Sequence, residues 1–205
     1  MKTDVKKTLD SYRARVGEFR VIEVPPLQYL MVDGHGDPNT SREYVDAITA
    51  LYPVAYALKS LSRRELDRDY VVPPLEALWW AEDHAVFTSA RDKSRWDWTA
   101  MILTPDWLGA DHVANAVATA TAKADPSPAL ARLRLETLEE GRCVQTLHVG
   151  PYDAEAGVLA DLHERFLPAA GLQPRGKHHE IYLSDPRRVD AARLRTILRQ
   201  PVEPA

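Results

Sequence analysis

The stretch YLMVDG at residues 29–34, followed by a helical segment over residues 44–58, has a counterpart later in the chain. The counterpart is QTLHVG at residues 145–150, followed by a helical segment over residues 155–167. In both copies, turn-forming residues that include a proline and an aspartate lie between the strand and the helix. The chain therefore contains the same strand-turn-helix pattern twice.

Two further strands follow each helical segment. A short strand with a glutamate comes first, at residues 74–79 and 178–183, and a strand ending in proline closes each half, at residues 99–105 and 195–201. One such unit cannot bury the apolar face of its own sheet, so the two copies are expected to pack together. We predict an α+β fold in which two pseudo-symmetric strand-helix-strand-strand repeats form antiparallel sheets around a central ligand cleft.

The composition is typical of a globular protein without a nucleic-acid or membrane partner. Of the 205 residues, 45% are apolar and 27% are charged, and the net charge is −4. No apolar run approaches the roughly 20 residues of a membrane-spanning helix, and a negative charge gives no electrostatic reason to expect nucleic-acid binding. The first residues lack the apolar core of a secretory signal, so we expect a cytoplasmic protein. The single cysteine, Cys143, excludes an internal disulfide.

Changes in composition divide the chain into four segments. These are an N-terminal arm or short helix (1–20), the first repeat (21–105), a connecting helix and linker (106–128) and the second repeat (129–202). In the first repeat, Pro53 interrupts the helical pattern and predicts a kink near Tyr52. Residues 84–95 are predicted to form a polar loop or hairpin tip.

In the second repeat, residues 133–138 and 142–149 are predicted to form a hairpin that turns at the intervening Gly141. Residues 191–198 have the composition of a helix, but the repeat predicts a strand over residues 195–199. We therefore expect only a helical turn over residues 190–193 before that strand.

Three segments together resemble the GyrI-like family, a small-molecule-binding fold that also forms the effector domain of AraC-type and MerR-type multidrug regulators. They are PLEALWW at residues 74–80, HVGPYD at residues 148–153 and HEIYLSDPRR at residues 179–188. The resemblance covers residues 21–202. Within the family the chain is similar to the stand-alone branch, because nothing in it resembles a helix-turn-helix.

The resemblance implies a protein that binds flat or cationic small molecules. For some members of the branch it implies hydrolysis of cyclopropane-bearing, DNA-alkylating natural products within an aromatic cage. On this basis we expect no cofactor and no metal, a small aromatic or cationic molecule as the partner, and a monomer or weak homodimer.

Four of the five tryptophans are candidates for such a cage. Trp79 and Trp80 end one predicted strand, while Trp96 and Trp98 begin the strand beside it. Because strand side chains alternate, Trp96 and Trp98 share a face, and one of the first pair joins them. The cluster forms either a plain tryptophan core or a surface that faces a ligand.

Glu76 and Glu180 take matching positions in the two repeats. Alternation places Glu180 on one face with Tyr182, and Glu76 on one face with Trp80. A carboxylate in an apolar strand is costly to bury without a partner. Each glutamate therefore either pairs with a protein group across the seam or, for Glu180 above all, meets a cationic ligand or positions water.

Tyrosine and histidine side chains complete the candidate site. Tyr152 follows Gly150 and Pro151 at the start of the second helix, where its ring can close one end of the seam, and Tyr44 is a similar candidate on the first helix. His148 is a candidate ligand contact. Adjacent strand histidines face opposite ways and no His-Glu-x-x-His motif is present, so a metal site is not expected.

Three functions remain open. A binding module would hold planar aromatic or lipophilic cationic xenobiotics through ring stacking and the charge of Glu180. A hydrolase would use the same pocket, with Glu180 as general base or water-orienting group and Tyr182 or Tyr152 donating to a developing phenolate. A non-catalytic ligand sensor would act on a separate transcription regulator.

Overall fold

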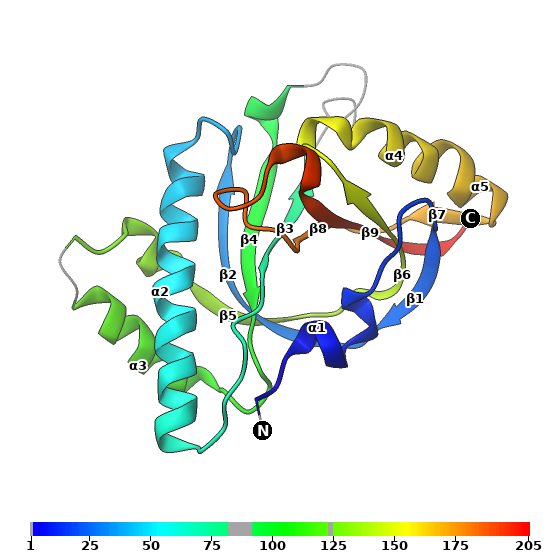
Figure 1. The fold of residues 1–205 in the computed structure, drawn as a ribbon. Helices are drawn as coiled ribbons and strands as arrows, with labels where there is room; N and C mark the ends of the chain where they lie inside the picture. The colour runs from blue at the N-terminus through cyan, green and yellow to red at the C-terminus, as the bar shows by residue number, and fades with distance from the viewer. Residues whose placement is uncertain (1, 82–91, 123–124) are drawn as a thin grey trace.

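The computed structural model describes residues 2–81, 92–122 and 125–205 (Figure 1). Its longer helices are α2 (Arg42–Glu65) and α3 (Ala110–Thr121), with α1 (Val5–Thr8), α4 (Ala156–Ala160) and α5 (Leu167–Ala169) as short helices. The strands are β1 (Arg20–Val24), β2 (Leu27–His35), β3 (Leu75–Trp80), β4 (Asp97–Leu103), β5 (Arg134–Leu138), β6 (Gly141–Val149), β7 (Leu172–Pro174), β8 (His178–Tyr182) and β9 (Arg195–Pro204).

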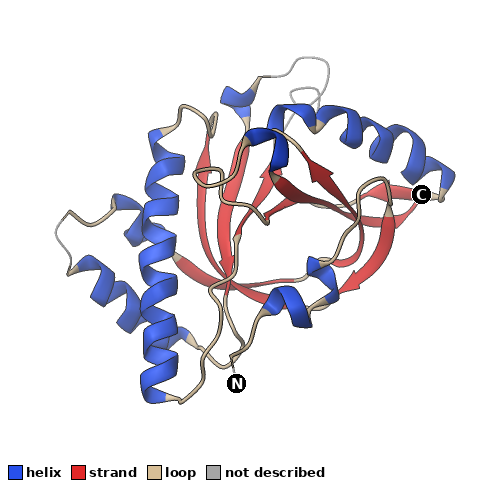
Figure 2. Ribbon diagram, in the orientation of Figure 1, coloured by secondary structure: helices blue, strands red, loops and turns tan. Residues whose placement is uncertain are grey.

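All pairings between these strands are antiparallel, and they form one curved sheet in the order β1-β6-β9-β8-β3-β4-β2-β5, with β7 added to the end of β9 (Figure 2). The order is symmetric about the pair of β8 and β3. On one side lie β3, β4 and β2 of the first half, and on the other lie β8, β9 and β6 of the second. The predicted α+β fold with antiparallel pairing is confirmed.

The first strand of each half pairs with a strand of the other half. β1 precedes β2 in the chain but pairs with β6, and β5 precedes β6 but pairs with β2. The predicted hairpin of residues 133–138 with 142–149 is therefore wrong. Gly141, with a φ of +65°, does mark a turn in the chain. A local turn signal cannot distinguish two strands that pair with each other from two strands that part to join different edges.

Helix α2 covers the first half of one sheet face, which we call the helical face and define by Trp79, Glu180 and Tyr182. The Ser41 side chain accepts a hydrogen bond from the Tyr44 N–H and caps the helix, and Arg63 and Arg64 lie in its last turn. The helix continues through Pro53 for its full 24 residues. Its inner side buries a stripe against the sheet that includes Ala47, Leu51, Val54 and Leu58.

The second half of the helical face is covered by a less regular helical segment. It begins with a 3-10 turn (Tyr152–Ala154), continues as α4, and passes through a π-helical stretch (Asp161–Phe166) into α5. Leu162 and Leu167 pack on Val144 of β6. The helix predicted from the repeat is present, but its hydrogen-bond register changes along its length.

The C-terminal segment is a strand, as the repeat predicts, and not the helix that its composition favours. A short 3-10 turn (Ala191–Arg193) leads into β9, which runs from Arg195 to Pro204 at the centre of the second half. Side chains from β9 lie on both buried faces of the sheet, which decides its conformation over intrinsic helix propensity. Of the polar loop predicted over residues 84–95, residues 84–91 lie outside the described part of the chain.

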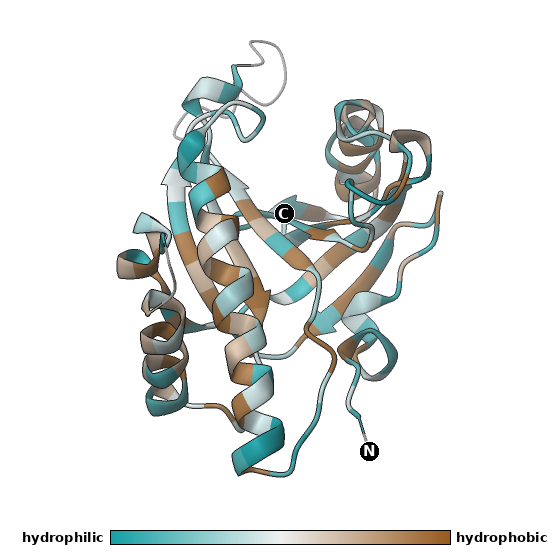
Figure 3. Ribbon diagram, turned by 60° about the vertical axis from the view of Figure 1, so that its left-hand side comes forward, coloured by the Kyte–Doolittle hydropathy of each residue, from teal (hydrophilic) through white to brown (hydrophobic). Residues whose placement is uncertain are grey.

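Apolar residues, brown in Figure 3, are frequent along the strands, whereas the C-terminal end of α2 is hydrophilic. Among the described residues, no helix combines the length and the apolar character that a membrane crossing requires.

The N-terminal segment is part of the core on the opposite face of the sheet. Tyr12, in a 3-10 turn after α1, is 5% exposed and packs with Tyr29, Leu78 and Ile181. The predicted arm is therefore anchored by an aromatic side chain. Its hydroxyl donates a hydrogen bond to Glu76.

A network of buried charges lies beneath this segment. The two ring nitrogens of His179 lie 3.0 Å from Glu76 Oε2 and 2.9 Å from Glu140 Oε1. The Arg199 guanidinium donates to Glu140 Oε2 at 2.8 Å. It also donates to Gln145 Oε1 at 3.1 Å and to a backbone carbonyl of the N-terminal segment at 2.6 Å. Every charge in the network thus has an oppositely charged partner, as buried charges require.

The pKa shifts of the network reflect its pairing. Burial alone would raise the pKa of Glu140, but His179 and Arg199 outweigh burial and lower the pKa to about 2. Burial would lower the pKa of His179, but the charge of Glu140 and hydrogen bonds to Glu140 and Glu76 raise the pKa above its ordinary value. An imidazolium with a carboxylate at each nitrogen is the state that this geometry favours.

We expect Arg199→Met to lower the free energy of unfolding by about 3–5 kcal/mol, because it leaves the buried carboxylate of Glu140 without its arginine. Urea unfolding followed by circular dichroism measures the change. The matched control is Arg187→Met, whose side chain is 80% exposed and should change stability by less than about 1 kcal/mol. Equal effects in the two variants would contradict the role given to the network.

The same network predicts how stability depends on pH. Because the pKa of His179 is raised, its contribution is complete below its ordinary value of 6.5 and is lost as the pH rises through the folded value. Because the pKa of Glu140 is lowered, its contribution is complete above 4.5 and is lost as the pH falls toward about 2. Melting temperatures should therefore be highest between pH 4.5 and pH 6.5, where both contributions are complete. The variant His179→Gln should lose less stability than the wild type as the pH rises above this range. An unchanged alkaline slope in the variant would contradict this assignment.

Candidate functional site

The register between β3 and β8 decides which side chains meet at the seam of the two halves. Ala77 lies opposite Glu180, and Trp79 lies opposite His178. Because alternate residues share a face, the side chains of His178, Glu180 and Tyr182 lie with Trp79 on the helical face. The sheet thus places a carboxylate, a phenol, an imidazole and an indole on one surface.

A chain of hydrogen bonds connects the centre of this surface. The indole Nε1 of Trp79 donates to the hydroxyl oxygen of Tyr182 at 3.2 Å, and that hydroxyl donates to Glu180 Oε2 at 2.7 Å. The other oxygen of Glu180 lies 3.6 Å from Nε2 of His178. The Glu180 side chain is 14% exposed, so its carboxylate is held at the edge of the interior and in reach of solvent.

Aromatic rings from both halves pack against Trp79 and Tyr182, the two aromatic members of this hydrogen-bonded chain. Trp79 and Trp98 are directly opposite each other on β3 and β4. The ring of Tyr44, from α2, lies 4.9 Å from that of Trp98 in an edge-to-face arrangement and 5.9 Å from that of Trp79. Trp96 packs edge-on against Trp79 at 5.6 Å, and Tyr152 packs edge-on against Tyr182 at 5.5 Å. We call these five rings together with Tyr182 the aromatic site.

Gly34 makes room for the innermost ring. A Cβ atom at this position would lie 2.2 Å from two carbons of the Trp98 ring. Trp98 is fully buried, and Gly34 is its partner across the β2–β4 pair. Only glycine lets the indole lie against the backbone of β2 at this point.

The tyrosines of the site are protonated phenols at neutral pH. Burial and the charge of Glu180 raise the pKa of Tyr182 and of Tyr44 well above the ordinary value. Burial, Glu155 and Glu180 raise the pKa of Tyr152 to about 12. All three hydroxyls therefore keep a proton that they can donate, and that of Tyr182 donates to Glu180.

Two residues that the sequence suggested for the site lie on the opposite face. Glu76 is one position out of step with Glu180, because Ala77 is the residue opposite Glu180, and its carboxylate belongs to the buried network. The ring of Trp80 lies under the Lys177 ammonium at 3.2 Å on that same face. The structure does not bring Glu76 or Trp80 together with Glu180.

His148 is on the helical face but toward the outer part of the second half. It lies opposite Thr196, which lies opposite Tyr182, so the three residues form one row across β6, β9 and β8. Its Nε2 is 3.2 Å from the carbonyl oxygen of Pro151, so the ring is held by the turn that leads to the second helix.

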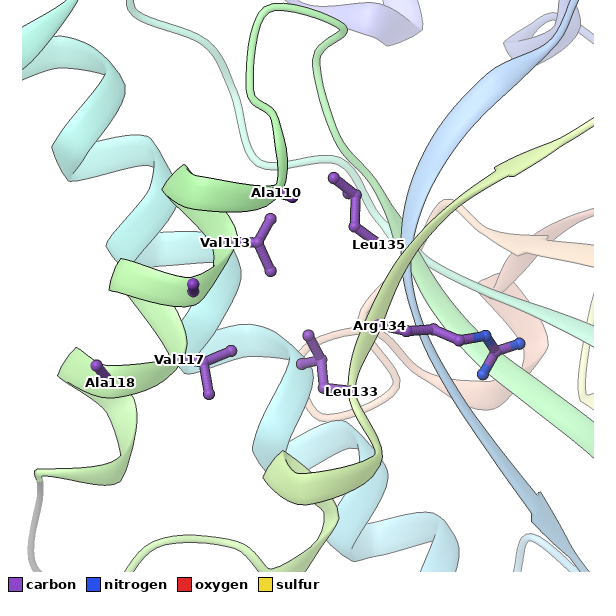
Figure 4. Close-up of a pocket in the computed structure, with 8 residues that line it drawn as sticks. Ala110, Val113, Val117, Ala118, Leu133, Arg134 and Leu135 are labelled. Carbon is purple, nitrogen blue, oxygen red and sulfur yellow. The ribbon is translucent and has the colours of Figure 1, made fainter.

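Two surface hollows formed by the described residues lie away from the aromatic site. The first, of about 530 Å³, is between α3 and β5, and the second, of about 440 Å³, is between α2 and α3. Figure 4 shows Val113, Val117 and Leu133 around the first hollow, while the charged end of Arg134 points away from it. Polar groups do not converge on this first hollow as they do in most small-molecule sites. At the seam, where the sequence predicts a cleft, the aromatic rings contact one another.

Within the described residues, no cluster of three histidine, cysteine or acidic side chains has a geometry suited to a metal ion.

A family model for the GyrI-like small molecule binding domain matches residues 17–203. The chain belongs to the GyrI-like family. Membership of a small-molecule-binding family supports a ligand site in this domain, and among the described residues the aromatic site has the carboxylate and converging rings suited to one.

Solved structures of two Listeria innocua proteins are similar to this GyrI-like protein over nearly the whole of both chains. One, described as an uncharacterized conserved protein, is 38% identical with a TM-score of 0.89, and the alignment covers 98% of this chain and 100% of that one. The other, described as a hydrolase, is 36% identical with a TM-score of 0.84 and the same coverage.

The C-terminal domain of EcmrR is similar in fold only. It is 12% identical with a TM-score of 0.55, and the alignment covers 92% of this chain and 98% of that domain. Among curated proteins, no significant match to the GyrI-like chain is found.

Three residues of the site were not recognised from the sequence as ligand contacts. His178 alternates with Glu180 and Tyr182, so strand periodicity was enough to place it, but it had been considered only for a metal. Gly34 belongs to the repeated stretch, yet nothing local indicates that an indole lies against it. Glu155, which is 5% exposed and influences the pKa of Tyr152 and Tyr182, carries no sequence signal, because it becomes buried only through the tertiary fold.

We expect Gly34→Ala to disturb Trp98, because the added methyl group overlaps the indole ring. Overpacking of this kind costs about 1–3 kcal/mol of stability and should change the near-ultraviolet circular dichroism of the tryptophans. Gly157→Ala is the control, since a methyl group there meets nothing within 4 Å and lies in a helix. Native-like spectra and stability in Gly34→Ala would show that the ring is not held as described.

Proposed function

We propose that this GyrI-like protein binds flat, lipophilic aromatic cations at the aromatic site and hydrolyses those that carry a strained, electrophilic ring. The observation that carries the proposal is the partly buried carboxylate of Glu180 with aromatic rings packed beside it. Trp79 and Trp98 would stack on the ligand, with Trp96, Tyr44 and Tyr152 at its margins. A flat ligand would enter by parting rings that now contact one another.

Charge and ring contacts both favour a cation in this position. Opposite charges 4 Å apart attract by about 4 kcal/mol at the effective dielectric constant of a protein surface. The faces of tryptophan and tyrosine rings add roughly 0.5–2 kcal/mol for each cation that they cover. Glu180 accepts a hydrogen bond from a neutral phenol, and within residues 2–81, 92–122 and 125–205 no arginine or lysine forms an ion pair with it.

The hydrolase step uses the same groups. Two relatives described as hydrolases, at 36% and 37% identity, support an enzymatic role. In a cyclopropane conjugated to a quinone-like carbonyl, water would attack the less hindered ring carbon while the ring bond breaks. Glu180 would take one proton of the attacking water and later release it to solvent, while the carbonyl oxygen would gain a proton from solvent to become a phenol. One water is therefore added overall.

The tyrosines would assist by donating hydrogen bonds. With pKa values above the ordinary range, the Tyr152 and Tyr182 hydroxyls would stabilise the developing phenolate without losing their protons. The rings would hold the flat substrate near its reacting geometry, which substitutes position for a reactive nucleophile.

We expect Glu180→Gln to weaken the binding of acridine orange, a flat aromatic cation, by about 10- to 100-fold, because it removes the charge and keeps the size of the side chain. Quenching of tryptophan fluorescence measures the dissociation constant. Glu23→Gln, at an exposed position on β1, removes the same charge elsewhere and should bind like the wild type. Equal affinity in wild type and Glu180→Gln would refute the binding proposal.

For hydrolysis, a cyclopropane-bearing alkylating compound should gain one water when it is incubated with the protein, as read by mass spectrometry. Glu180→Gln should slow this conversion by about 10²–10⁴-fold, which is the usual contribution of a positioned base. Conversion by the variant at the wild-type rate would remove Glu180 from the reaction while leaving the binding proposal intact.

A further inference from the structure

We infer that the aromatic site continues into a polar subsite under the start of the second helix, built by Thr196 and Glu155, that accepts the hydrogen-bond-donating end of the ligand. The inference rests on the proposed function and narrows its ligand class. The preferred ligands would be planar aromatic cations that carry N–H or O–H groups at one end, such as aromatic amines.

Thr196 is the residue that points to such a subsite. It lies in the row formed by His148, Thr196 and Tyr182, and it therefore faces the helical side of β9 next to the tyrosine that contacts Glu180. The residue is fully buried, yet its hydroxyl has no hydrogen-bond partner among the described residues. A buried hydroxyl without a partner is unfavourable and rare, which makes a group from outside the chain a natural partner.

Glu155 brings a second carboxylate next to Tyr152, because its backbone N–H donates to the Tyr152 carbonyl oxygen at 3.2 Å. It lies at the N-terminal end of α4 and is 5% exposed. Its charge raises the pKa of both Tyr152 and Tyr182, whose rings are 5.5 Å apart. The charges of both Glu180 and Glu155 therefore act on the two tyrosines.

The groups of this subsite are mainly acceptors. An ionised carboxylate can only accept hydrogen bonds, and a threonine hydroxyl can accept two while it donates one. The rings of the first half, in contrast, offer stacking surface with few polar atoms. A ligand that satisfies both parts has a flat apolar body and a donor group at the end that enters the second half.

A pair of matched dyes tests the inference. Proflavine and acridine orange share a flat cationic acridine ring, but the amino groups of proflavine donate hydrogen bonds, whereas those of acridine orange are methylated and do not. We expect the wild type to bind proflavine more tightly. Thr196→Val should weaken the binding of proflavine by about 3- to 10-fold, which is the effect of one lost hydrogen bond. It should weaken the binding of acridine orange by less than about 2-fold.

Two further variants complete the set. Thr196→Ser keeps the hydroxyl and should still bind proflavine more tightly than acridine orange. Glu155→Gln should reduce this difference in affinity. Thr196→Val should also melt at or above the wild-type temperature, because it removes a buried hydroxyl that no protein group satisfies. A lower melting temperature with equal losses for both dyes would mean a structural role for Thr196 and would overturn the inference.

The outcomes separate this inference from the proposed function. If Glu180→Gln weakens both dyes while Thr196→Val leaves the preference unchanged, the aromatic site stands and the polar subsite does not. If neither dye quenches the fluorescence of the wild type, both the proposed function and the subsite fail.

Discussion

The pairing of β3 with β8 is the constraint on which the site depends. Ala77 opposite Glu180 fixes every side chain of the two central strands to one face or the other. A shift by a single residue would exchange the faces of one strand relative to its neighbour. Glu180 would then meet the apolar core of the N-terminal segment, and His179 would lose the carboxylate of Glu76. The register is held by burial on both sides of the sheet.

The two faces use their charges in different ways. On the opposite face, Glu76 and Glu140 are bound to His179 and Arg199, so the negative charges are balanced within the chain. On the helical face, Glu180 receives hydrogen bonds from a neutral phenol and lies near one imidazole. The first arrangement stabilises the fold, and the second is the one on which the proposed ligand site rests. Glu76 and Glu180, which the sequence repeat aligned, lie on opposite faces of the sheet and have different partners.

Much of the fold could be predicted from the sequence, because the repeated pattern of strands and helices is written in local periodicity. The repeat also identified β9 as a strand against its own composition. The exchange of β1 and β5 was not predictable in this way, since a turn at Gly141 is equally compatible with a hairpin and with separating strands. It is set by contacts between residues far apart in the chain.

In the candidate site, too, local sequence patterns predicted some features, and tertiary packing determined the others. Strand alternation grouped Glu180 with Tyr182 and Glu76 with Trp80, but it did not show that the two groups lie on opposite faces of the sheet or which of them faces α2. Trp79 and Trp98 meet because β3 and β4 are neighbours, which the repeat implied. The close approach of Trp98 to Gly34, and the burial of Glu155 and Thr196, depend on packing that no short stretch of sequence records.

The exchange of first strands between the halves bears on how such a protein arises by duplication. An ancestral chain of one half would have carried a strand with no place in its own sheet, and it would have found that place in a second copy of itself. Joining two such copies end to end turns an obligate pair into one polypeptide without altering any strand contact. Once joined, the copies are free to diverge, so that the first half can carry the tryptophans while the second carries the carboxylate.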